Sequence, residues 1–148
     1  MRPTEIILHC AATKEGADFS IKDIDAWHRQ RGFKKVGYHF VIRLDGTVEP
    51  GRKENEVGAH CLKHNNRSLG ICYIGGLDST GKPKDTRTQA QKEAMFNLVG
   101  GLMLKYDLSP DDIHVHSEYA PKACPCFTRE TFLKELDEWL RNQTLNKK

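Results

Sequence analysis

The amino-acid sequence predicts a single α/β domain, in which a mixed β-sheet of about five to six strands is flanked by about three main α-helices. Short runs of branched apolar residues alternate with longer segments of helical periodicity, and this alternation is typical of a sheet covered by helices. A length of 148 residues suits one compact domain spanning residues 1–148. We find neither an internal repeat nor a linker that would divide the chain.

Five segments have the pattern of strands, and they comprise residues 4–10, 36–44, 47–50, 68–75 and 113–116. The Asp45-Gly46 pair predicts a tight turn between the second and third of these segments. The fourth segment is apolar on both faces, so we expect it to lie centrally in the sheet. The fifth is short and ends at His116.

Three segments have the pattern of helices. Ser20 with Asp23, and Thr88 with Gln91, have the spacing of N-terminal capping boxes, and Thr128 begins a third helix. The expected buried stripe of the second helix is made by residues that recur every four positions, namely Ala94, Leu98, Leu102 and Tyr106. The polar residues 141–148 are expected to form a frayed tail.

Charge and hydropathy exclude several classes of function. A net charge of +3 without a dense basic block argues against nucleic acid and is compatible with an anionic surface such as a cell-wall polymer. No apolar run is long enough for a membrane span, and the first ten residues do not resemble a signal peptide. We therefore expect synthesis in the cytoplasm without a signal peptide, no membrane partner and a monomer.

Histidine and cysteine residues near the ends of the chain predict a metal site. The five cysteines are odd in number and irregularly spaced, which argues against a disulfide framework. His9 ends the first predicted strand, His116 ends the last, and Cys124 follows in a proline-stiffened loop. If the two strands are neighbours, two imidazoles and one thiol meet at one sheet edge. Three protein ligands with a free fourth position are typical of catalytic zinc.

Several motifs run in order along nearly the whole chain, namely ILHCAAT at His9, AWHxxxGF at Ala26, VGYHFVIxxDGTVE at Val36, VGAH at His60, NxxSLGICYIGG at Asn65, TxAQ at Thr88 and HSEYAPKACP at His116. With these motifs the sequence resembles the type 2 N-acetylmuramoyl-L-alanine amidases. It is most similar to the small phage zinc amidases of the T7-lysozyme type, and animal peptidoglycan recognition proteins are related to them.

The resemblance implies one catalytic zinc ion held by His9, His116 and Cys124, with catalytic assistance from Tyr38 and Lys122. It implies hydrolysis of the amide bond between N-acetylmuramic acid and L-alanine in peptidoglycan. We expect a bacteriolytic endolysin, encoded by a phage or prophage, that acts on the bacterial cell wall after release. We also expect His60 to form a wall of the substrate groove.

Two other functions compete with the amidase. A recognition module of the same fold would bind peptidoglycan without cutting it, and such modules often lack the cysteine ligand. A cysteine hydrolase would use Cys124 or Cys126 with His116. Cys126 departs from the family pattern, and its possible roles are a buried spare thiol, an alternative ligand or an oxidation partner. Glu118 either orients a ligand histidine or is simply exposed.

Overall fold

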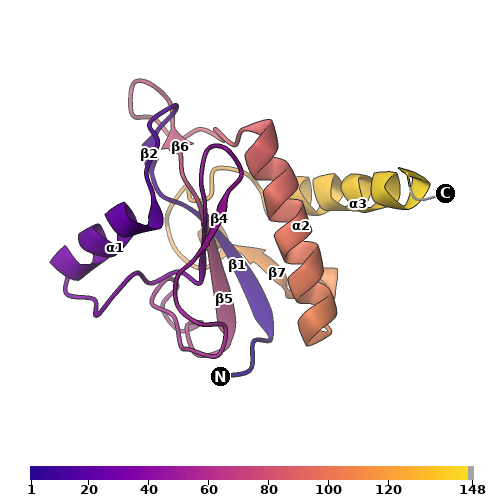
Figure 1. Cartoon of the computed structure of the whole chain (residues 1–148), viewed down its shortest axis with the longest axis horizontal. Helices are drawn as coiled ribbons and strands as arrows, with labels where there is room; N and C mark the ends of the chain where they lie inside the picture. Colours follow the sequence, from indigo (N-terminus) through magenta and orange to yellow (C-terminus); the bar gives the residue numbers. More distant parts are fainter. Residues whose placement is uncertain (147–148) are drawn as a thin grey trace.

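The computed structural model describes residues 1–146 and contains a mixed five-stranded sheet with helices on both faces (Figure 1). The strands lie in the order β4-β3-β5-β1-β7. Their bounds are Val48–Pro50 for β4, Phe40–Ile42 for β3, Ser68–Tyr73 for β5, Glu5–Cys10 for β1 and Ile113–Val115 for β7. Only β4 is antiparallel to its neighbour. The predicted fold class is confirmed.

The two central strands, β1 and β5, pair in parallel over six residues each. All twelve of these residues are buried, since β1 and β5 are covered on both faces and have a neighbour on both sides. The prediction of a central fourth segment is therefore confirmed. A separate two-stranded sheet of β2 (Thr13–Lys14) and β6 (Gly76–Leu77) was not predicted.

Some predicted strands are shorter in the structure. β3 begins only at Phe40, and Gly37 instead pairs with the neighbouring loop, where the Ala59 N–H donates to the Gly37 carbonyl oxygen at 3.0 Å. The residue directly before Phe40, His39, is still hydrogen-bonded to β5, since its N–H donates to the Gly70 carbonyl oxygen at 2.9 Å. The predicted turn at Asp45-Gly46 is present, with Gly46 at a φ of 88°.

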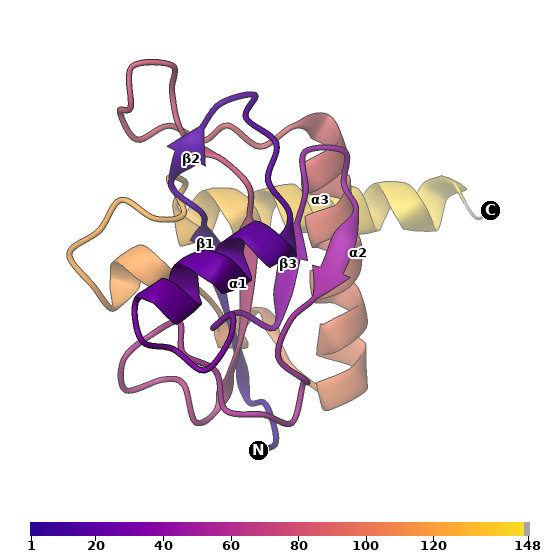
Figure 2. The same ribbon diagram turned by 60° about the vertical axis from the view of Figure 1, so that its left-hand side comes forward.

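Two helices cover one face of the sheet and one covers the other, as Figure 2 shows with α1 in front of the strands and α3 behind them. Helices α2 (Gln89–Tyr106) and α3 (Arg129–Asn146) share a core with the side chains of β1 and β5 that point toward them. Helix α1 (Ile21–Gln30) packs on the opposite face, where Ile24 and Val41 belong to a second buried cluster. No helix among residues 1–146 has both the length and the apolar character of a membrane span.

Helix ends follow the predicted capping, whereas two details of the helices differ from expectation. The Gln91 N–H donates to Thr88 Oγ1 at 3.0 Å, and the Thr88 N–H donates to Gln91 Oε1 at 2.9 Å. The buried apolar positions of α2 are Met95, Phe96, Val99 and Leu102. Of the expected stripe only Leu102 is buried, and Ala94, Leu98 and Tyr106 are partly buried. Helix α3 continues to Asn146, so the expected frayed tail is helical from residue 141 to 146, and residues 147–148 lie outside the described residues.

Candidate active site

The first and last strands of the sheet are neighbours, as the predicted metal site requires. β1 and β7 run in parallel with Leu8 paired to Val115, so His9 and His116 each stand one residue beyond this pair. Parallel strands end at the same edge of a sheet, and ligands bind at that edge in open α/β folds. His9 is the fifth residue of β1, and His116 begins a 3₁₀ turn, His116–Glu118.

Three donor atoms converge at this edge. His9 Nδ1 lies 3.2 Å from His116 Nδ1 and 4.0 Å from Cys124 Sγ, and donor atoms of all three residues lie within 4.8 Å of one another. Tetrahedral ligands of zinc at about 2.0–2.3 Å stand about 3.3–3.8 Å apart, so this spacing fits one ion bound between them. Within residues 1–146 this is the one group of three such side chains.

The Cys124 sulfur is placed by the backbone of β1. The Cys10 N–H donates to Cys124 Sγ at 3.1 Å, and the buried Cys10 side chain belongs to the core cluster against which Cys124 packs. Cys124 is therefore both close to the two imidazoles and held in a suitable orientation.

Cys126 lies outside this group of donors. Its thiol donates to the Gly76 carbonyl oxygen at 3.2 Å, and burial, which dominates, raises the pKa of the thiol to about 12. A thiol with such a pKa is protonated near neutrality and is a poor nucleophile. This position matches a spare thiol rather than a ligand.

His60 is hydrogen-bonded to His9, a contact that the sequence did not reveal. Its Nδ1 lies 2.8 Å from His9 Nε2, and its Nε2 lies 3.3 Å from Ser68 Oγ, which donates to the His64 carbonyl oxygen. Because the Ser68 hydroxyl donates its proton to that carbonyl, it accepts a hydrogen bond from His60 Nε2, which we assign as the protonated nitrogen. His60 Nδ1 is then unprotonated and accepts from His9. His9 then carries its proton on Nε2 and presents an unprotonated Nδ1 to the group. No spacing signal leads from a loop histidine to this contact.

Burial keeps the histidines of the site neutral. It is the main cause that lowers the pKa of His9 well below its usual range, lowers the pKa of His60 to about 3 and lowers the pKa of His116. The Lys122 ammonium adds to this effect on His9 and His116. Neutral imidazole is the form that binds a metal ion.

Tyr38 and Lys122 face the same cavity, which has a volume of about 600 Å³ and is also lined by His60 and His116. The Tyr38 ring centroid lies 5.1 Å from that of His9, and burial raises the pKa of its phenol, so the hydroxyl remains a donor. Lys122 is exposed at the rim. The predicted helpers therefore border the space beside the three donor atoms.

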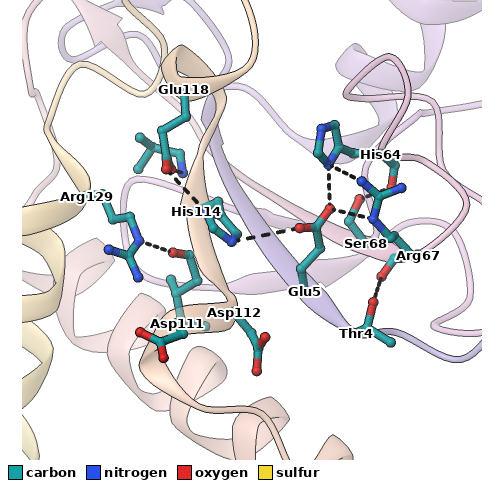
Figure 3. A network of polar contacts seen from close by, with 12 residues as sticks. Thr4, Glu5, His64, Arg67, Ser68, Asp111, Asp112, His114, Glu118 and Arg129 are labelled. Atoms are coloured by element: carbon teal, nitrogen blue, oxygen red, sulfur yellow. Dashed lines mark hydrogen bonds and ion pairs between the residues drawn. The ribbon is translucent and has the colours of Figure 1, made fainter.

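His114 and Glu118 belong to a separate polar network, drawn in Figure 3. Glu5 Oε1 lies 2.7 Å from His64 Nδ1, and Glu5 Oε2 lies 3.8 Å from His114. Glu118 pairs with His114 at 3.3 Å and accepts from the Val115 N–H. Glu118 therefore contacts His114 rather than His116. The structure brings His116, and not His114, to the donor group.

Comparison with known proteins identifies the family. Residues 1–127 match the family model Amidase_2, which is described as N-acetylmuramoyl-L-alanine amidase. The chain belongs to this family. It is 43% identical over 122 residues to the endolysin of Escherichia phage T7, covering 82% of this chain and 80% of that protein. It is 30% identical over 116 residues to peptidoglycan-recognition protein SC2 of Drosophila simulans, covering 77% of this chain and 60% of that protein.

Among solved structures, this amidase-family chain is similar to N-acetylmuramoyl-L-alanine amidase LysC from Clostridium intestinale URNW. The TM-score is 0.78 at 31% sequence identity, and the match covers 93% of this chain and 87% of that one. The resemblance to phage enzymes and to peptidoglycan recognition proteins is thus confirmed.

Proposed function

We propose that the protein is a zinc-dependent N-acetylmuramoyl-L-alanine amidase that acts as a phage or prophage endolysin. The observation that carries the proposal is the convergence of His9, His116 and Cys124 beside a cavity of about 600 Å³. Relatives named endolysin, which align over more than four fifths of this chain, support the same activity. The bond cleaved is the amide that joins the lactyl group of N-acetylmuramic acid to L-alanine.

The donor set favours zinc. Two neutral imidazoles and a thiolate are ligands that zinc prefers, whereas magnesium and calcium prefer oxygen. Three protein ligands leave a fourth tetrahedral position for water or substrate, as in catalytic sites. When bound, zinc activates water and polarises a carbonyl group.

The remaining residues act on the reacting groups. As the substrate carbonyl becomes tetrahedral, its oxygen gains negative charge, and the Lys122 ammonium at the rim stabilises that charge. The protonated Tyr38 phenol has two possible tasks, which are to orient the attacking water or to pass a proton toward the leaving amine. His60 lines the cavity and orients His9, so it serves both the substrate groove and the metal site.

The cysteine hydrolase is the weaker hypothesis. Cys126 points to Gly76 and has a raised pKa, so it lacks both an imidazole partner and a thiolate. A non-catalytic recognition module is also disfavoured, since all three metal-binding side chains and both helpers are present in the chain.

The test is hydrolysis of purified peptidoglycan with and without a chelator, followed by zinc add-back. We expect loss of turbidity together with new N-terminal L-alanine, both abolished by chelation and restored by zinc. New reducing ends would instead indicate a glycosidase and refute the bond assignment. Binding without either product would indicate recognition alone, and activity that survives chelation would exclude the zinc mechanism.

A further inference from the structure

The loop that carries Lys122 and Cys124 is fastened at its C-terminal end by a buried tyrosine. The Tyr73 hydroxyl donates to the Pro125 carbonyl oxygen at 2.7 Å, across 52 positions of sequence. Tyr73 is fully buried at the end of β5, and Pro125 directly follows Cys124. This hydrogen bond therefore ties the central sheet to the peptide unit next to the metal-binding thiol.

An aromatic and cationic stack supports the same point of the loop. The ring of Phe127 is stacked near that of Tyr73, with centroids 6.2 Å apart and an angle of 26° between the planes. The Arg87 guanidinium lies 3.8 Å from the Phe127 centroid and is held by Asp85 at 2.9 Å and Glu135 at 3.0 Å. The Arg87 side chain is 0% exposed, so the stack buries this cation against the Phe127 ring.

The backbone between these contacts adopts a tight turn. The Cys126 N–H donates to the Ala123 carbonyl oxygen at 2.7 Å, and Cys126 has a φ of 72°, which is uncommon for a residue with a side chain. The Cys126 thiol donates to the Gly76 carbonyl oxygen at 3.2 Å, which helps to hold this conformation. The turn has no regular secondary structure of its own, so its position depends on contacts with the core.

We propose that Tyr73 is a positioning residue, whose hydroxyl holds the Pro125 carbonyl and thereby keeps the Cys124 thiol within reach of His9 and His116. The inference rests on the proposed function, because it assigns Tyr73 a role toward the proposed zinc site. Tyr73 neither belongs to the donor group nor lines the cavity beside it. Its effect is indirect, through the angle at which the loop presents sulfur to the two imidazoles.

The test compares Tyr73→Phe with a matched control, Tyr106→Phe. The Tyr106 hydroxyl also donates to a partner, Glu54, but it lies on α2, away from the loop. Zinc affinity is measured on both variants and on the wild type by competition with a chromophoric chelator. Supporting contacts around metal ligands typically contribute about 10- to 100-fold in affinity, so we expect about a tenfold loss for Tyr73→Phe and no change for Tyr106→Phe.

Hydrogen exchange of the zinc-free proteins gives a second, independent readout. Tyr73→Phe is expected to speed exchange at the amides of residues 122–124 and of Cys126, since Pro125 has no N–H. Exchange at the amides of residues 6–8 of β1 should not change, and these serve as an internal control against general destabilisation. Unchanged loop exchange, or zinc affinity within twofold of wild type, would overturn the positioning role. Absence of zinc binding in the wild type would overturn the proposed function itself, and loop exchange would still report whether Tyr73 fastens the loop.

Discussion

Replacement of His60 by alanine is expected to weaken zinc binding by about 10- to 100-fold, the range typical for residues that orient a ligand histidine. This loss equals about 1.4–2.7 kcal/mol of binding free energy. The reason is the 2.8 Å hydrogen bond between His60 Nδ1 and His9 Nε2, which keeps the proton away from the Nδ1 that faces Cys124. Without it, His9 can rotate or exchange tautomers, and part of the binding energy is spent on restoring the bound form.

The measurement is a zinc titration against a chromophoric chelator, combined with steady-state hydrolysis of peptidoglycan. His60→Asn is the matched control, because its side-chain oxygen stands where Nδ1 stands and can accept the same proton. We expect this variant to recover most of the affinity. A zinc affinity of His60→Ala within twofold of wild type, with only KM raised, would show that His60 contacts the substrate alone and would refute the orienting role.

Three further predictions concern the loop that carries Lys122, the pH dependence of stability and the packing of the core. Lys122→Met should lower kcat by about 10²- to 10³-fold without weakening zinc binding, since its positive charge faces the neutral histidines of the site; weaker zinc binding would contradict this role. The Lys53 N–H, and next the Lys35 ammonium, lower the pKa of the Glu56 carboxyl group from 4.5 to about 2. The ionised carboxylate therefore stabilises the folded protein fully above pH 4.5, and this stabilisation is lost as the pH falls toward 2. Glu56→Gln should therefore have a lower free energy of unfolding than wild type in urea near neutral pH. If the difference between the two proteins does not shrink at acid pH, the ionised Glu56 carboxylate is not its cause. Ile71→Ala, at a fully buried position of β5, should lower the free energy of unfolding by about 2–5 kcal/mol, and a loss below about 1 kcal/mol would contradict the tight packing seen around it.

The fold could be predicted where local pattern and burial agree. The continuous apolar run that contains β5 is recognisable because a strand covered on both faces needs apolar residues at every position. Alternation along β1 places His9 and Cys10 on opposite faces, and the structure has them so. The buried face of helix α2 was harder to predict, because this helix packs against both the sheet and α3. Apolar residues therefore occur on several of its faces, and a single four-residue stripe does not identify the most buried one.

The donor group was predictable only in part. Its residue types and its place at strand ends follow from sequence, but the pairing of β1 with β7 joins segments about a hundred positions apart, which no local pattern encodes. The hydrogen bonds of His60 and Tyr73 were not predictable for the same reason. Each reaches across about fifty positions to a group whose location depends on the finished fold.

The wide sequence separation of the donor atoms has a consequence for the order of assembly during synthesis. His9 leaves the ribosome early, but its partners lie 107 and 115 positions later in the chain. A nascent chain therefore has no complete donor group until β7 has docked beside β1 and the following loop has closed. Since a metal ion gains its full binding energy only from the assembled group, the proposed zinc site predicts that metal uptake follows the pairing of β1 with β7 and the closing of the Cys124 loop.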